Sequence, residues 1–330
     1  MTTIDSDQTG HRDDSSGSGP VPTPEVRRYL EASDHASTED VFDPVELRIQ
    51  NNAVGVAVRG ALEVVADVQD AAIEGIPVRH YWPAGIELPA KAVVVWVHGG
   101  GWVHGDLEVY DGLARALANS FGAEVIAVDY RLAPENPFPE GFNDVWAVVG
   151  AVSKDYETLI LAGDSSGGNI AAATALRARD MEIAISAQLL MYPVLDNRET
   201  AFKKDFRSRY SPFVNQRRFG ESTYERILWI WDTYVPDPIL RESPYAAPLR
   251  ASDFRGVAPA VIITAEHDIL RGEAEEYAAR LRGDDVQVSL LEFPGQIHGF
   301  LQMRGVFSEA VSALDQIASA VDSILDPGAG

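Results

Sequence analysis

From residue 92 onward, short and fully apolar segments alternate with amphipathic stretches of helical length. The apolar segments predict strands, and the amphipathic stretches between them predict helices. Strands that are apolar throughout are buried on both faces, as in parallel sheets covered by helices on each side. The alternation therefore predicts an α/β fold with a mostly parallel sheet. The expected strands are 92–98, 124–129, 158–162, 187–192, 260–265 and 287–293, and the expected helices are 111–120, 142–152, 168–179, 272–281 and 309–324.

Three segments lie outside this alternation. Two β-like runs separated by Glu74-Gly75 predict a hairpin, and hence an antiparallel start to the sheet. Residues 1–22 are acidic and rich in glycine and serine, which predicts a disordered tail, and a short helix is expected after Thr23-Pro24-Glu25. Residues 196–245 are rich in aromatic residues and arginine. Long insertions at the carboxyl edge of such a sheet are commonly lids or caps.

Composition excludes several classes of protein. The chain of 330 residues has no cysteine, which rules out disulfides, thiolate metal sites and a cysteine nucleophile. Its formal charge of −23 disfavours binding to nucleic acid or to an anionic membrane surface. The first residues lack the pattern of a secretory signal, and no apolar run reaches membrane-spanning length. We therefore expect a cytoplasmic protein with no membrane or nucleic-acid partner.

The strongest chemical signal is "LILAGDSSGGN", in which a G-x-S-x-G motif follows an expected strand and precedes an expected helix. A serine at such a tight turn is held with its hydroxyl projecting above the sheet, where it can act as a nucleophile. Ser165 has glycine at both the −2 and +2 positions, so it is the expected nucleophile rather than Ser166. A phosphate-binding turn is the alternative, but neither of the common phosphate-binding glycine motifs occurs in the chain.

A serine hydroxyl needs a neighbouring base, and histidine is the usual one. His298 lies in a loop after the last expected strand, at the edge of the sheet where ligands bind in open α/β folds. It also follows Ser165 in the chain, as expected for this kind of serine turn. The sequence therefore predicts His298 as the base. The other six histidines are His11, His35, His80, His98, His104 and His267.

The base in turn needs a carboxylate that orients it and stabilises its charged form. Asp268 lies directly after the expected strand 260–265 and before a helix, between the serine and the histidine in the chain. We expect Asp268 to be this acid, with Glu266 as the alternative. No metal site is expected here, because a third ligand with suitable spacing is missing from the sequence.

The segment "VVVWVHGGGWVHGD" places three consecutive glycines after a buried strand. Acyl transfer passes through a tetrahedral oxyanion, which backbone N–H groups stabilise. We expect Gly100, Gly101 and the residue after the nucleophile, Ser166, to donate these N–H groups. Gly99 would give the turn room, and His98 is expected to orient the loop rather than act as a second base.

Together these motifs resemble the hormone-sensitive-lipase-like family of α/β-hydrolases, the bacterial family IV esterases. The similarity extends from about residue 62 to the C-terminus, with the motifs in the same order. The departure is "EHDILRGEA", where many relatives have "DPLRDEG", and it leaves the aspartate in place. The matching segments are HGGGW (98–102), GDLEVYD (105–111), VDYRLAPENPFP (128–139), GDSSGGN (163–169), SPYAAP (243–248), AEHDILRGEAEEYA (265–278) and HGF (298–300).

The resemblance implies an α/β-hydrolase fold with an eight-stranded sheet in residues 61–195 and 246–330. It implies a helical cap made from residues 23–60 and the insert 196–245. It also implies hydrolysis of carboxylic esters without a cofactor, by Ser165, His298 and Asp268. In "DYRLAPE", residues 129–131 are expected to form a structural polar network.

The leading hypothesis is therefore a serine esterase that acts on small-molecule esters with short-to-medium acyl chains. An amidase or acyltransferase would use the same three residues, and a non-catalytic ligand-binding relative is a further alternative. A homodimer is a possible assembly. The residues expected to contact substrate are Trp102, Tyr192, Phe202 and Trp229, although an aromatic stripe is more often core packing than ligand contact.

Overall fold

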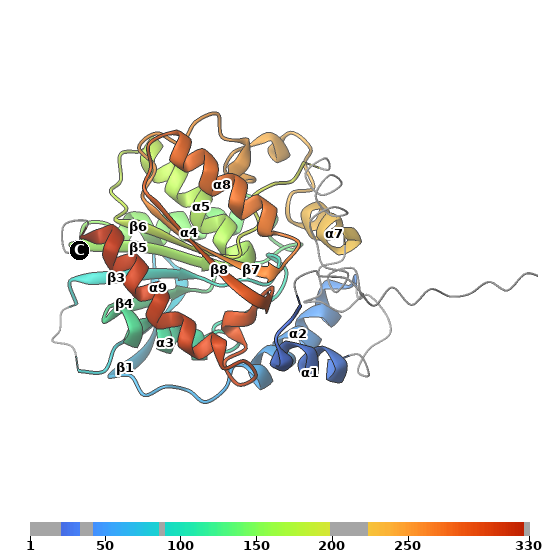
Figure 1. Cartoon of the computed structure of the whole chain (residues 1–330). Coiled ribbons are helices and arrows are strands. Elements are labelled where there is room, and N and C mark those ends of the chain that lie inside the picture. Colours follow the sequence, from blue (N-terminus) through green and yellow to red (C-terminus); the bar gives the residue numbers. More distant parts are fainter. Residues whose placement is uncertain (1–20, 34–41, 86–89, 199–223, 327–330) are drawn as a thin grey trace, which may run out of the picture.

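The computed structural model of the chain describes residues 21–33, 42–85, 90–198 and 224–326 (Figure 1). An eight-stranded sheet has the order β1-β2-β4-β3-β5-β6-β7-β8. β1 and β2 form an antiparallel hairpin, β2 pairs antiparallel with β4, and all the other pairs are parallel. The strands are β1 (Asp67–Ile73), β2 (Ile76–Trp82), β3 (Ala92–Val97), β4 (Glu124–Val128), β5 (Thr158–Asp164), β6 (Ala187–Met191), β7 (Ala260–His267) and β8 (Val288–Ile297).

Helices cover both faces of this sheet, so the central strands are buried from end to end. Alternate residues of β3, β4 and β5 belong to two separate apolar clusters, one on each face. Helices α4 (Glu140–Val152), α5 (Ser165–Asp180) and α8 (Arg271–Gly283) pack on one face. Helices α3 (Asp111–Phe121) and α9 (Glu309–Leu325) pack on the other. This is the reason that the strands are apolar throughout rather than alternating with polar residues.

A second group of helices lies beyond the end of the sheet where the parallel strands finish (Figure 1). It consists of α1 (Pro24–Ser33), α2 (Pro44–Val58) and α7 (Tyr224–Tyr234). The phenyl ring of Phe42, just before α2, meets the indole of Trp229 on α7 edge to face, with ring centroids 5.8 Å apart. Three short 3₁₀ turns complete the described structure, at Leu240–Glu242, Pro248–Arg250 and Phe300–Gln302.

Helix α2 lies in the segment 23–60 for which the resemblance implied helices, but no local pattern predicted its bounds. Its start carries clear signals, since the Asp43 carboxylate accepts hydrogen bonds from the N–H groups of Val45 and Glu46, and Pro44 occupies the first turn. Its apolar residues do not form one buried stripe, however. Leu47 and Gly55 are its buried residues, whereas Val45 and Ile49 point to solvent.

The α/β-hydrolase fold expected from the sequence is confirmed. Helix α5 begins at Ser165, three residues before the expected start, because the serine turn itself forms the first turn of the helix. β8 continues to Ile297 and so carries the chain directly to His298. Across the ranges that the structure describes, none of the helices has the length and apolar character needed to span a bilayer. Of the expected disordered tail, residues 1–20 lie outside the residues that the structure describes.

Leu161, at the centre of β5, tests how strongly the sheet depends on its buried strands. Its side chain is fully buried between helices and sheet, so Leu161→Ala should lower the free energy of unfolding by about 2–5 kcal/mol. Val64 is 83% exposed, so Val64→Ala should change the free energy of unfolding by less than about 0.5 kcal/mol. Urea denaturation of the two variants measures both values. Equal effects would contradict the assignment of β5 to the core.

Candidate active site

The turn between β5 and α5 holds Ser165 in a backbone conformation that few residues adopt. Its φ angle is +51°, in the left-handed region. The glycines on either side are required by space. A Cβ atom on Gly163 would lie 2.4 Å from the carbonyl oxygen of Gly167, and one on Gly167 would lie 2.1 Å from that of Val97. The turn therefore packs against the end of β3 with no room for side chains.

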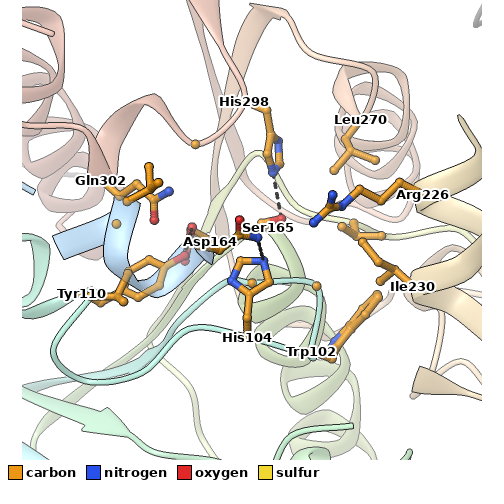
Figure 2. Close-up of a pocket in the computed structure, with 18 of the residues that line it drawn as sticks. Trp102, His104, Tyr110, Asp164, Ser165, Arg226, Ile230, Leu270, His298 and Gln302 are labelled. Carbon is orange, nitrogen blue, oxygen red and sulfur yellow. Dashed lines mark hydrogen bonds between the residues drawn. The ribbon is translucent and has the colours of Figure 1, made fainter. Parts of the chain in front are cut away.

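Ser165, His298 and Asp268 form one hydrogen-bonded chain. The Ser165 hydroxyl lies 2.9 Å from Nε2 of His298 (Figure 2). Nδ1 of the same ring lies 2.7 Å from Oδ2 of Asp268. Because an ionised carboxylate can only accept, Nδ1 carries the proton and Nε2 is free to accept from the serine. The other oxygen of Asp268 accepts a hydrogen bond from the Leu270 N–H at 2.9 Å, which fixes the carboxylate.

Glu266, the alternative acid, occupies a different place. Its carboxylate accepts a hydrogen bond of 2.7 Å from the N–H of Gly295, within β8. Gly295 has a φ angle of +71°, so this bond fixes a kink three residues before His298. The structure thus brings Asp268 to the histidine and leaves Glu266 to hold the strand that carries it.

The three glycines after β3 form a tight turn beside Ser165. Gly100 has a φ angle of +115°, and its carbonyl oxygen accepts from the N–H groups of Val103 and His104 at 3.1 and 3.0 Å. A Cβ atom at Gly100 would lie 2.0 Å from the His104 carbonyl oxygen, so no other residue fits. Both Gly100 and Gly101 line the pocket around Ser165. Neither N–H group has a hydrogen-bond acceptor among the residues that the structure describes.

Asp164, directly before Ser165, joins this glycine turn to β5. Its Oδ1 accepts from the Gly99 N–H at 2.6 Å, and its Oδ2 accepts from the Tyr110 hydroxyl at 3.2 Å. Complete burial raises the pKa of the Asp164 carboxyl to about 7. The interaction holds the glycine turn at a fixed distance from the serine.

Two further histidines lie near the glycine turn, and neither is suited to act as a base. His98 is buried, donates from Nδ1 to the Gly99 carbonyl oxygen at 2.7 Å and stacks between Tyr110 and Tyr130. Burial lowers the pKa of His98. For His104, burial and the neighbouring charge of Arg226 lower the pKa to about 3. Both rings therefore stay neutral at physiological pH, and the expected orienting role of His98 agrees with its contact to Gly99.

The pocket in front of Ser165 has a volume of about 130 Å³ and is mostly apolar. Trp102 lines it and stacks on Tyr234, with ring centroids 4.1 Å apart. Of the other residues expected to contact substrate, Tyr192 is buried against the His298 ring rather than lining the pocket, and Trp229 packs on Phe42. Phe202 lies outside the described residues. Lining residues that sequence reasoning missed include Tyr110, Arg226, Leu270 and Gln302 (Figure 2). Asn51 and Val54 also line the pocket.

Tyr192, expected to contact substrate, lies just after β6 and is buried. Its φ angle is +38°, and its ring packs on the His298 ring with the centroids 5.0 Å apart. The sequence carries no signal for this conformation, since tyrosine rarely has a positive φ. The side chain therefore contacts His298 and is not part of the pocket lining.

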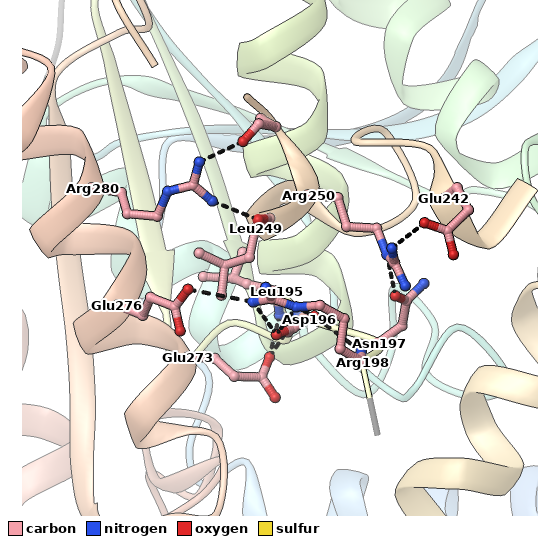
Figure 3. Close-up of polar contacts among 11 residues, drawn as sticks. Leu195, Asp196, Asn197, Arg198, Glu242, Leu249, Arg250, Glu273, Glu276 and Arg280 are labelled. Atoms are coloured by element: carbon pink, nitrogen blue, oxygen red, sulfur yellow. Dashed lines mark hydrogen bonds and ion pairs between the residues drawn. The ribbon is translucent and has the colours of Figure 1, made fainter. Parts of the chain in front are cut away.

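A buried carboxyl network fixes the point where the segment after β6 leaves the sheet (Figure 3). Oε2 of Glu273, on α8, accepts from the N–H groups of Leu195 and Asp196 at 2.6 and 2.8 Å. The Asp196 carboxylate is fully buried and pairs with Arg198 at 2.6 Å. Burial, with the nearby charges of Asp196 and Asp268, raises the pKa of Glu273 well above its usual range. Glu273 thus links residues 195 and 196 to α8, the helix that follows Asp268.

In the region "DYRLAPE", the expected network of residues 129–131 is only partly buried, because the Arg131 side chain is 47% exposed. The Arg131 guanidinium pairs with Asp144 at 2.7 Å and with Glu140 at 2.6 Å, both on α4. The Tyr130 hydroxyl donates to the His98 carbonyl oxygen at 2.9 Å. Among the described residues, no three histidine or carboxylate side chains converge as a metal site would require.

A serine on the turn after β5, its histidine after the last strand and an eight-stranded, mostly parallel sheet define the α/β-hydrolase class of protein. The alpha/beta hydrolase fold family model matches residues 94–302, and the chain belongs to this family. The similarity to hormone-sensitive-lipase-like esterases inferred from the motifs is confirmed.

Several characterised relatives are ester hydrolases. The chain is 33% identical over 293 residues to the carboxylesterase NlhH of Mycobacterium tuberculosis, covering 85% of this chain and 84% of that protein. It is 32% identical to an arylesterase of Saccharolobus solfataricus, covering 84% of this chain and 92% of the relative. The crystal structure of an esterase from Pyrobaculum calidifontis superimposes with a TM-score of 0.79 at 33% identity, covering 92% of this chain and 99% of that one.

The buried Asp164 carboxyl should make stability depend on pH. Its pKa is about 7 in the folded protein, against an ordinary value of 3.8, so between these values the folded state binds more protons than the unfolded state. The free energy of unfolding therefore falls as pH rises through this window, by on the order of 4 kcal/mol from this group. Asp164→Asn keeps an acceptor for Gly99 and should remove this dependence.

Urea denaturation at pH 4.5, 6 and 8 measures the effect. The exposed Asp315 gives the matched control, since Asp315→Asn should leave the pH dependence of the parent protein unchanged. If Asp164→Asn and the parent keep a constant difference in unfolding free energy across this range, the carboxyl does not titrate as described.

Proposed function

We propose that this chain is a serine carboxylesterase in which Ser165 attacks the ester carbonyl. The observation that carries the proposal is the hydrogen-bonded chain from Ser165 through His298 to Asp268, which opens onto an apolar pocket. Membership of a family with characterised carboxylesterases supports the reaction type. Cleavage of an amide or transfer to another alcohol would use the same acyl-enzyme, and no feature of the pocket favours either.

Acylation begins when His298 Nε2 takes the proton of Ser165 as its oxygen attacks the carbonyl carbon. The imidazolium that forms is stabilised by the ionised Asp268 at 2.7 Å. The negative charge on the former carbonyl oxygen is stabilised by the N–H groups of Gly100, Gly101 and Ser166. These groups lie in the glycine turn and in the first turn of α5, where backbone N–H groups have no partner within the helix. His298 then gives its proton to the departing alcohol.

Deacylation repeats these steps with water as the nucleophile. His298 takes a proton from water, which attacks the acyl-enzyme, and the second tetrahedral intermediate uses the same N–H groups. The proton then returns to Ser165 as the acid is released. Trp102, which lines the pocket beside Gly101, is the proposed contact of the substrate chain.

The size of the pocket supports short-to-medium acyl esters as substrates. A dry cavity of about 150 Å³ holds one benzene ring, and this pocket, at about 130 Å³, is of similar size. We further propose that residues 23–60 and 196–245 form one cap over the pocket, which agrees with the contact between Phe42 and Trp229. A cytoplasmic location and assembly as a homodimer remain predictions from the sequence.

The two neighbouring serines give a matched pair of variants. Ser165→Ala should lower kcat for p-nitrophenyl butyrate by about 10⁴-fold or more, because the nucleophile is lost. Ser166→Ala keeps its backbone N–H and should stay within about threefold of the parent. Initial rates and covalent labelling by an organophosphonate measure the two roles. Near-parental activity of Ser165→Ala would make the assignment wrong.

The acyl-chain preference follows from the volume of the pocket. For p-nitrophenyl esters, kcat/KM should be highest for chains of about two to eight carbons and should fall for longer chains, which exceed a cavity that holds about one benzene ring. A series from acetate to palmitate measures this, with a matched anilide for each ester to compare amide cleavage. A maximum at palmitate would contradict an acyl site of this size.

A further inference from the structure

One face of helix α2 meets the loop that follows the three glycines. Nε of Arg48 donates to the carbonyl oxygen of Val103 at 2.6 Å. One turn later, Nδ2 of Asn51 lies 3.1 Å from Nε2 of His104. After one more turn, Gly55 packs so closely on Val109 that a Cβ atom would lie 2.6 Å from its methyl group. The helix therefore follows the loop along its length.

Asn52, on the same face, binds the loop at two points. Its Nδ2 donates to Oδ2 of Asp106 at 2.8 Å, and its Oδ1 accepts from the N–H of Gly105 at 3.1 Å. The other oxygen of Asp106 accepts from the Val109 N–H at 2.8 Å, which closes the turn. The Asn52 amide thus uses both its donor and its acceptor on two consecutive residues.

Gly105 in turn lies directly behind the glycine turn. Its φ angle is +92°, and a Cβ atom there would lie 2.6 Å from the Gly99 carbonyl oxygen and 2.8 Å from Nδ1 of His98. A shift of Gly105 would therefore press on Gly99. The opposite side of Gly99 is fixed by the Asp164 carboxylate, which accepts its N–H at 2.6 Å.

The attachment of α2 to this region is polar and directional. Leu47 and Gly55 of the helix are buried and Val58 packs on the core, whereas its contacts with residues 103–106 are hydrogen bonds from Arg48, Asn51 and Asn52. Apolar contacts tolerate sliding, whereas a pair of hydrogen bonds fixes both distance and orientation. The polar face of α2 therefore sets the position of the loop and does more than cover the pocket.

We infer that α2 is part of the scaffold of the oxyanion hole and that Asn52 is a positioning residue for it. Asn52 acts through Gly105 and Gly99 on the N–H groups of Gly100 and Gly101. This inference rests on the proposed esterase function. Because these N–H groups bind the transition state more strongly than the substrate, losing their alignment lowers kcat and leaves KM nearly unchanged.

The first test is Asn52→Ala in the full-length chain, assayed with p-nitrophenyl butyrate. Loss of two ordinary hydrogen bonds should lower kcat by about tenfold, with KM within about twofold of the parent. Gln50 provides the control, because it is exposed on the other side of α2 and bonds to Glu46 at 2.9 Å. Gln50→Ala should keep the parental kcat.

A second variant, Asn52→Asp, gives a readout that a loss of packing would not produce. It keeps the acceptor for Gly105 but places a carboxylate at hydrogen-bond distance from Asp106, and two such groups do not both stay ionised. The charged and titratable groups around Asp106 belong to several elements: they are Asp70, Arg79, His98, Glu108 and Asp129, with Arg48 one turn along α2. All these groups are also present in the parent, so the ratio of the variant kcat to the parental kcat reports the effect of the substitution at residue 52 alone.

The ratio of the Asn52→Asp kcat to the parental kcat should rise at least threefold between pH 8 and pH 5.5, because the two carboxylates then share a proton. The same ratio for Asn52→Ala should not change with pH. A kcat of Asn52→Ala within twofold of the parent would overturn the inference. A second result would also overturn it: a kcat that falls in both variants together with their Tm, with no recovery of the Asn52→Asp kcat at low pH. Activity of Ser165→Ala, by contrast, would overturn the esterase function itself.

Discussion

The hydrogen bond between the Gly99 N–H and the Asp164 carboxylate joins the two halves of the anion-binding part of the site. It spans 65 positions in the chain and only 2.6 Å in space. The contact exists because β3 and β5 are neighbours in the sheet, with Val97 opposite Gly163 in their register. Gly167 then lets the serine turn approach the end of β3 without a side chain between them, and Gly163 lets the turn close on itself. The glycine turn and the serine turn are therefore one unit, built on one strand pair.

Much of the fold could be predicted because its physical signals are local. Strands buried on both faces must be apolar throughout, and the G-x-S-x-G turn must have glycines where the backbones touch. The order of Ser165, Asp268 and His298 in the chain then restricts which strand ends can supply the base and the acid. The sequence favoured Asp268 over Glu266, and the contacts agree, because Asp268 lies 2.7 Å from His298 whereas Glu266 bonds to the Gly295 N–H.

The remaining parts of the site depend on contacts that no local pattern records. Helix α2 has a clear N-cap, yet its inward face is polar, so an apolar periodicity does not reveal it. Asn51 and Arg226 enter the pocket from segments far from the catalytic motifs. Tyr192 turns beneath His298 through a positive φ angle that its residue type does not suggest. Such features are decided by tertiary packing rather than by propensity.

The position of His298 at the end of β8 has a consequence for how the site is divided. The proposed nucleophile and the proposed oxyanion N–H groups follow β3 and β5, in the middle of the sheet, whereas His298 and Asp268 follow β8 and β7, at its edge. The hydrogen bond between Ser165 and His298 joins the two sets across 133 positions of sequence. Under the proposed roles, local opening of that edge would separate the proton acceptor from the nucleophile while the central strands stay folded.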